Sequence, residues 1–146
     1  MYCYEYNKRT EKSMRPNILW ICTDQQRYDT IHSLNNPCIN TPNLDHLFSE
    51  GVAFSRAYCQ SPICSPSRAS FLTGLDPGYV GVSRNGTEFF PEKPHVELIT
   101  KRLADSGYDC GLSGKLHIAS AWSGIEARTD DGYRDFEYSH APTQGL

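Results

Sequence analysis

The stretch from Cys64 to Gly74, which reads Cys-Ser-Pro-Ser-Arg-Ala-Ser-Phe-Leu-Thr-Gly, contains the residues best suited to chemistry. Ser65 is a favoured N-cap residue, Pro66 suits the first position of a helix, and the glycine suits its end. Cys64 is therefore predicted just before a helix N-terminus, where free N–H groups and the helix dipole favour an anion. Arg68 lies one turn into this helix and is expected to reach back toward the cysteine. We expect an acidic thiol or an anion site here.

Other polar residues follow segments that are predicted to be strands. Residues 17–22 form a short apolar run typical of a strand buried on both faces, and Asp24 comes directly after it. Residues 108–112 are predicted to form another strand, after which the chain reaches Lys115. Ligands bind beyond the carboxyl ends of the strands in parallel sheets, so Asp24 and Lys115 are expected in that region.

Helices are predicted between these strands. Thr41 as N-cap and Pro42 at the first helical position begin a helix that Gly51 ends, with apolar residues along one face. Residues 52–58 indicate a further strand, and a second amphipathic stretch at about 96–106 indicates another helix. The alternation predicts an α/β fold with a mostly parallel sheet flanked by helices.

The composition narrows the class of protein. The chain has 146 residues, enough for one domain, and a net charge of −3, which gives no electrostatic case for a nucleic-acid or membrane-surface binder. Residues 1–13 form a polar N-terminal tail without the apolar core of a signal peptide, and no run is long enough to span a membrane. The compartment therefore stays open, with the cytoplasm as the default. The domain is expected over residues 14–146.

The six cysteines form no CxxC pair and no regular framework. We expect most of them to be reduced, buried small hydrophobic residues, with Cys64 as the exception. The cysteines are Cys3, Cys22, Cys38, Cys59, Cys64 and Cys110.

The Cys-x-Pro-Ser-Arg sequence at residues 64–68, followed by Ala-Ser-Phe-Leu-Thr-Gly, resembles the signature of the sulfatases, which have an alkaline-phosphatase-like α/β fold. The resemblance covers about residues 15–118, and the matching segments occur in the order that the family has. Since the family's enzymes run to several hundred residues, the chain resembles the N-terminal portion of a sulfatase domain. Besides the signature, the matching segments are residues 16–27, 41–45, 51–54, 103–108 and 114–117, the last of which reads Gly-Lys-Leu-His.

The resemblance implies a specific nucleophile. In sulfatases the signature cysteine, here Cys64, is oxidised by a formylglycine-generating enzyme to an aldehyde, formylglycine. One hydroxyl of the aldehyde hydrate attacks sulfur and displaces the alcohol, and the other expels sulfate as the aldehyde re-forms. Arg68 would hold the formylglycine, while Lys115 and His117 would bind the sulfate and its leaving side.

The resemblance also implies a calcium ion, which polarises a sulfate oxygen. Asp24 matches the first metal-binding acid, and the modified Cys64 contributes oxygens. Gln25 stands where many relatives have a second Asp; its amide oxygen can bind calcium but lowers the negative charge of the site. The partners implied are a small-molecule or carbohydrate sulfate ester and the formylglycine-generating enzyme.

Other interpretations stay open at this point. A phosphoester or phosphonate monoester hydrolase of the same superfamily would use the same nucleophile, and a non-catalytic fragment would lack the metal ligands and the further Lys and His that sulfatases supply from later segments. A plain thiolate at Cys64 with His117 as base fits less well, because the Pro-Ser-Arg tripeptide specifies oxidation in the family. Taken singly, Asp24 suits a strand-end cap, and Asn85 followed by Gly and Thr suits a turn.

Overall fold

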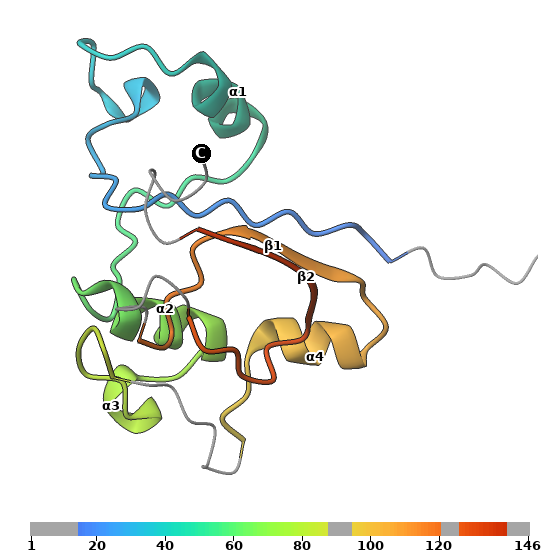
Figure 1. Ribbon diagram of the computed structural model, residues 1–146. Helices are drawn as coiled ribbons and strands as arrows, with labels where there is room; N and C mark the ends of the chain where they lie inside the picture. Colours follow the sequence, from blue (N-terminus) through green and yellow to red (C-terminus); the bar gives the residue numbers. More distant parts are fainter. Residues whose placement is uncertain (1–14, 88–94, 121–125, 140–146) are drawn as a thin grey trace, which may run out of the picture. The chain divides into compact units, whose positions relative to one another are not determined.

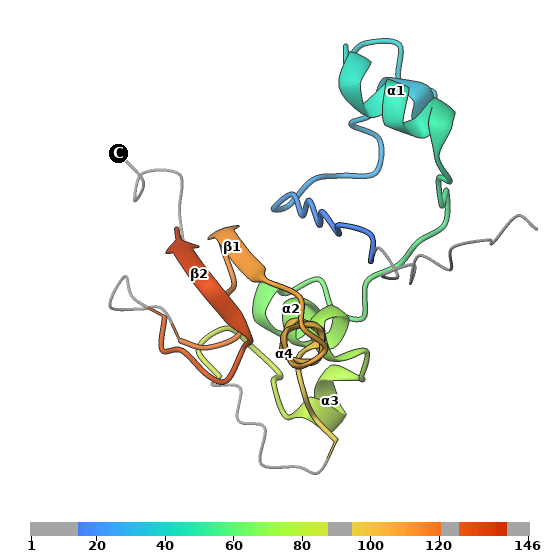
Figure 2. The ribbon, with the colours of Figure 1, turned by 90° about the vertical axis from the view of Figure 1, so that its right-hand side faces the viewer.

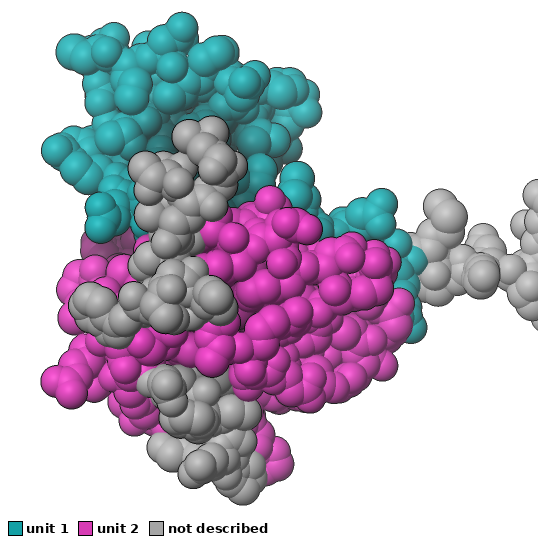
Figure 3. Space-filling view, viewed as in Figure 1, with its two compact units in different colours: residues 1–55 teal, residues 56–146 magenta. Residues whose placement is uncertain are grey.

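The computed structural model describes residues 15–87, 95–120 and 126–139, so the predicted tail at 1–13 lies outside the described residues. The chain divides into two compact units, residues 1–55 and residues 56–146, which Figure 3 shows in different colours. No helix in the described part of the chain is long and apolar enough to cross a membrane.

The first unit contains a 3-10 helix, η1 (His32–Leu34), and the helix α1 (Pro42–Glu50), which confirms the helix expected at 41–51 (Figure 1). Thr41 precedes α1 but its side chain does not cap the helix. Its hydroxyl accepts the N–H of His32 and donates to Asp45 at 3.1 Å. Ser33 also donates to Asp45 from its N–H and its hydroxyl, at 2.9 and 2.6 Å, and these bonds lower the pKa of Asp45. Polar contacts thus join α1 to η1.

The two strands expected at residues 17–22 and 52–58 are wrong, because neither run forms a strand in the structure. Their apolar side chains are exposed: Leu19 is 83% exposed and Val52 is 82% exposed. An apolar run forms a strand only where a neighbour accepts and donates its backbone hydrogen bonds. Neither run has such a neighbour among the described residues.

The second unit contains a parallel pair of strands, β1 (Cys110–Gly114) and β2 (Tyr133–Tyr138). The strand expected at 108–112 is therefore confirmed as β1 with its ends moved, whereas β2 was not expected. The register pairs Cys110 with Tyr133 and then Gly111 with Asp135, which leaves one extra residue on β2, as in a bulge. The α/β class with a parallel sheet is confirmed.

Three helices belong to the second unit: α2 (Cys64–Thr73), α3 (Pro77–Val80) and α4 (Ile99–Asp105). Figures 1 and 2 show them on one side of the two strands. α2 packs against α3 and α4, and α4 packs against both strands.

Two helix starts differ from expectation. The predicted N-cap at Ser65 is wrong: the residue before α2 is Ile63, so Cys64 is the first residue of the helix. The end is as predicted, since Gly74 has a left-handed φ of 71°. α4 begins later than 96 because Leu98, which is 1% exposed, has extended backbone and serves as the cap residue.

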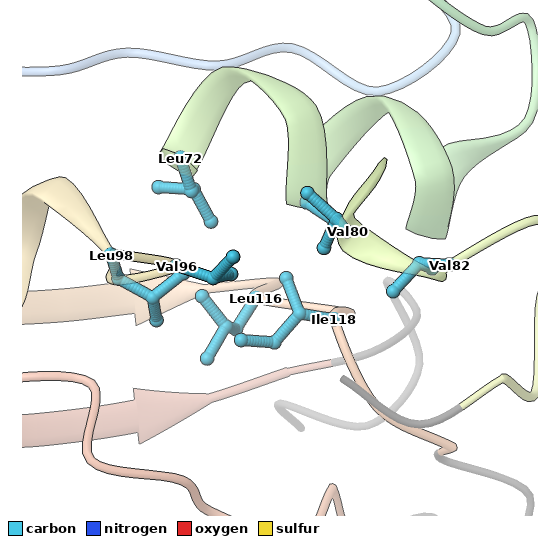
Figure 4. Packing of buried hydrophobic residues seen from close by; sticks show 8 residues of the cluster. Leu72, Val80, Val82, Val96, Leu98, Leu116 and Ile118 are labelled. Atoms are coloured by element: carbon cyan, nitrogen blue, oxygen red, sulfur yellow. The ribbon is translucent and has the colours of Figure 1, made fainter. Parts of the chain in front are cut away.

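The core lies between α2, the segment before α4 and the segment after β1, and Figure 4 shows Leu72 of α2 opposite Leu116 and Ile118. Gly132 lets the start of β2 pass close to α4, because a Cβ there would lie 2.5 Å from the Cα of Lys101. The cluster of buried residues consists of Ala69, Leu72, Val80, Val82, Val96, Leu98, Leu116 and Ile118.

The cysteines are less buried than expected. The five in the described ranges are free, as predicted, but Cys22, Cys38 and Cys59 are exposed, and Cys64 and Cys110 are half-buried. Burial and the neighbouring Asp109 raise the pKa of Cys110.

Candidate active site

The first turn of α2 is held by a residue far along the chain. Asn85 accepts the backbone N–H of Ser65 through Oδ1 at 3.0 Å and donates from Nδ2 to the sulfur of Cys64 at 3.4 Å. The first N–H groups of a helix have no partner within the helix, so Asn85 acts as a cap supplied from outside. The same amide fixes the Cys64 side chain at the helix N-terminus.

Arg68 connects α2 to the segment after β1. The arginine is 7% exposed, and its Nη1 donates to the carbonyl oxygen of Lys115 at 2.6 Å. A guanidinium stays charged at all relevant pH values, and a hydrogen bond from a charged donor is stronger than a neutral one. Arg68 thus joins the helix that begins with Cys64 to the backbone of the Gly-Lys-Leu-His segment.

His117 lies in the same segment and is buried, with 6% of its surface exposed. Its φ of 54° is in the left-handed region, which is uncommon for a residue other than glycine. The carboxylate of Glu126 accepts three consecutive backbone N–H groups: that of His117 on Oε2 at 2.6 Å, and those of Ile118 and Ala119 on Oε1 at 2.6 and 2.8 Å.

The Glu126 carboxylate is itself buried, with 4% exposure, and it acts electrostatically on β2. Burial raises the pKa of Tyr138 to about 12, and the negative charge of Glu126 adds to this shift. The region around the His117 segment therefore combines low solvent access with a fixed negative charge.

The second unit brings together part of the predicted site. Arg68 and Lys115 are hydrogen-bonded, and Cys64 and His117 lie on the elements that this bond connects. Asp24 and Gln25 belong to the first unit, where Gln25 has a left-handed φ of 56°. The convergence of Asp24, Cys64, Arg68, Lys115 and His117 on one side of the sheet stays a prediction.

Calcium requires several oxygen ligands, and the described residues contain no group of three or more His, Cys, Asp or Glu that could hold a metal. The donor types of Asp24 and Gln25, a carboxylate and an amide oxygen, are those that calcium prefers.

Two residues of this site were missed by the sequence reasoning. Asn85 suited a turn, and no local pattern indicates that its side chain meets a helix 21 positions earlier in the chain. Glu126 belongs to no motif, and the sequence shows only that an acidic residue follows the Gly-Lys-Leu-His segment within about ten positions. Both contacts depend on tertiary structure.

Comparisons with known proteins agree with the motif. The family model described as Sulfatase matches residues 16–141. The chain is 35% identical over 143 residues to arylsulfatase A of Bos taurus, covering 90% of this chain and 27% of that protein. It is 38% identical over 105 residues to an arylsulfatase of Clostridium perfringens, with 72% and 21% covered.

A carbohydrate-directed relative is similar to a comparable degree: N-acetylglucosamine-6-O-sulfatase of Bacteroides thetaiotaomicron is 30% identical over 120 residues, which cover 82% of this chain and 21% of that protein. The chain thus spans about a fifth to a quarter of the length of the curated relatives it matches.

Proposed function

Because this chain belongs to the sulfatase family, we propose that it carries the nucleophile portion of a sulfuric ester hydrolase active site. The observation that carries the proposal is the Cys-x-Pro-Ser-Arg signature at the start of α2, whose Arg68 donates a hydrogen bond to the carbonyl of Lys115. The signature and the Gly-Lys-Leu-His segment thereby belong to one folded unit. Arylsulfatases and a carbohydrate sulfatase among the relatives support a sulfate ester as substrate.

The residues of the second unit have separate tasks in this proposal. Asn85 orients the side chain at position 64, and the N-terminus of α2 favours the negative charge of a bound sulfate. Lys115 supplies positive charge to the sulfate, and His117 transfers a proton at the leaving oxygen. Arg68 holds the Lys115 backbone through Nη1 and, as the resemblance implies, would also hold the formylglycine.

Two groups are required besides the side chains of the chain. The hydrate of a formylglycine made from Cys64 would supply the nucleophilic hydroxyl, and a calcium ion would supply a Lewis acid for a sulfate oxygen. Asp24 and Gln25 would each offer an oxygen of the kind that calcium prefers, and the modified Cys64 would offer others. Calcium takes six to eight oxygen ligands, so these residues alone fill only a part of its shell.

We infer that the 146-residue chain alone does not turn over substrate. It corresponds to about a quarter of the length of arylsulfatase A, and its predicted calcium ligands are too few. Loss of a single preorganised donor costs about 10²–10³ in rate in other enzymes, and several would be missing.

Co-expression with a formylglycine-generating enzyme, followed by peptide mass spectrometry, tests the nucleophile. We expect the aldehyde at Cys64 and reduced conversion in Pro66→Ala and Arg68→Ala. Cys59 serves as the internal control and should carry no aldehyde, because it lacks a proline two positions and an arginine four positions downstream. Unmodified Cys64 beside a competent modifying enzyme would contradict the proposal.

An assay of the aldehyde-bearing chain with calcium tests the activity and the choice of substrate. An aryl sulfate and an aryl phosphate are compared, each with the native sequence and Cys64→Ala. We expect no turnover of either ester. Turnover that Cys64→Ala abolishes would show that the chain is active by itself, and the preferred ester would decide between sulfatase and phosphoester hydrolase.

A further inference from the structure

We propose that Glu126 is a positioning residue that holds the Lys115–His117 segment in its working conformation; its role in sulfate binding rests on the proposed function. Glu126 itself does not need to contact a substrate. Its buried carboxylate receives the backbone N–H groups of three consecutive residues, 117 to 119, at 2.6 to 2.8 Å.

An ionised carboxylate suits this task by its chemistry. It has two oxygens, only accepts hydrogen bonds, and has room for about four donors. Hydrogen bonds from N–H groups to a charged acceptor are about twice as strong as neutral ones. A glutamine of the same size would keep one acceptor but would place an NH₂ group against an N–H donor.

The backbone conformation that Glu126 holds at His117 is energetically unfavourable. His117 has a φ of 54°, and a left-handed conformation of a non-glycine residue persists only where the surrounding structure enforces it. The first of the three N–H groups that Glu126 accepts is that of His117 itself. The carboxylate is thus bonded at the strained residue and at the two residues after it.

Arg68 holds the same segment from the other end. Its guanidinium donates to the carbonyl of Lys115, two residues before His117. A buried cation on α2 therefore fixes an acceptor of the segment, and a buried anion fixes its donors. Lys115 and His117 lie in the stretch that these two anchors define.

The alternative is that Glu126 only stabilises the second unit as a whole. Glu126→Gln distinguishes the two roles, with Glu137→Gln as the matched control, because Glu137 lies exposed on β2 and its substitution removes the same charge. Hydrogen exchange of the amides of residues 117–119 is measured by NMR on the whole chain, together with the ring signals of His117.

In Glu126→Gln we expect the protection of the three amides to fall at least tenfold while the amides of α2 keep theirs, and the ring signals of His117 to move toward those of the exposed His46. Glu137→Gln should change neither. Equal loss of protection throughout the second unit, or no change at residues 117–119, would overturn the positioning role.

Inorganic sulfate, titrated into the same samples, separates this inference from the proposed function. We expect sulfate to shift the signals of Lys115 and His117, with an apparent Kd several-fold higher in Glu126→Gln than in Glu137→Gln. Equal Kd values would overturn the positioning role. If sulfate shifts neither signal in the native chain, the proposed function is contradicted, and the exchange data decide the role of Glu126.

Discussion

The two units of the chain are stabilised in different ways. Among the described residues, every buried hydrophobic residue lies in the second unit, where Leu98, Val82 and Ile118 are nearly inaccessible to solvent. The first unit has no buried residue in η1 or α1, and its apolar residues around Leu19 are exposed. Apolar burial is the main stabilising contribution to folding, so the second unit is the more stable of the two.

The polar contacts of the two units also differ, in the distance along the sequence that they join. In the first unit the contacts of Asp45 with Ser33 and Thr41 join neighbours within 12 positions. In the second unit the bond from Arg68 to Lys115 spans 47 positions. The segment proposed to bind sulfate is therefore held by contacts between residues far apart in the sequence. Asp24 and Gln25 belong to a unit that is ordered by local contacts.

A pair of leucine substitutions tests the difference in stability between the two units and should give the largest effect. Leu98→Ala, at a side chain that is 1% exposed, should lower the free energy of unfolding by about 2–5 kcal/mol because it leaves a cavity in the core. Leu19→Ala, at 83% exposure, should change it by less than about 0.5 kcal/mol. Urea unfolding followed by circular dichroism gives both values, and equal losses would contradict the difference between the units.

Two arginines provide a polar version of the test. Arg68→Met leaves the Lys115 carbonyl without its buried donor and should cost about 1–3 kcal/mol. Arg27→Met removes an exposed ion pair with Asp29 and should have no measurable effect. Thermal unfolding of both variants against the native chain is the measurement; a larger loss for Arg27→Met would reverse the interpretation.

Asn85 connects stability to the candidate nucleophile. Asn85→Ala removes the external cap of α2 and should cost about 0.5–2 kcal/mol, the usual range for a lost cap. Asn85→Asp keeps the acceptor for Ser65 and should preserve stability, but its negative charge should slow alkylation of Cys64 several-fold. Alkylation of the exposed Cys59 is the control and should not change.

The backbone of His117 allows a test in which glycine is the better residue. His117→Gly should be more stable than His117→Ala by about 1 kcal/mol, because only glycine adopts a φ of 54° without steric cost. At Ser113, an exposed position of β1, the order should be the opposite, with alanine more stable than glycine. Chemical unfolding of the four variants compares the two positions, and alanine as the better residue at 117 would show that the left-handed conformation is not enforced.

The parts of the molecule that follow from local sequence were predictable. α1 was expected from Pro42 and Gly51, and the end of α2 from Gly74, because caps act within a few residues. The resemblance assigns Cys64, Arg68, Lys115 and His117 to one catalytic site, and this assignment stays a prediction. β2 was missed because its polar and aromatic residues form no apolar run.

The remaining differences come from contacts that are distant in sequence. The run at 17–22 has the composition of a buried strand, but a strand also needs a neighbour, and composition does not specify one. Asn85 and Glu126 belong to the site through bonds to Cys64 and to the His117 segment, which the fold alone brings near. The exposed apolar residues of the first unit likewise show that an apolar composition does not by itself predict burial.

A pH dependence at the end of β2 is expected only in alkaline solution. Burial, together with the charge of Glu126, raises the pKa of Tyr138 to about 12, while a tyrosine in an unfolded chain titrates near 10. The neutral phenol is therefore the form that the fold prefers, and the contribution to stability is complete below about pH 10 and lost as the pH rises to about 12. Tyr138→Phe should remove one tyrosinate transition near pH 12 from the absorbance titration and flatten the fall of stability over that range. Glu126→Gln should lower the pKa of this transition by a fraction of a unit, because it removes the negative charge that helps to raise it. If the transition near pH 12 is still present in Tyr138→Phe, it belongs to another tyrosine and the prediction is contradicted.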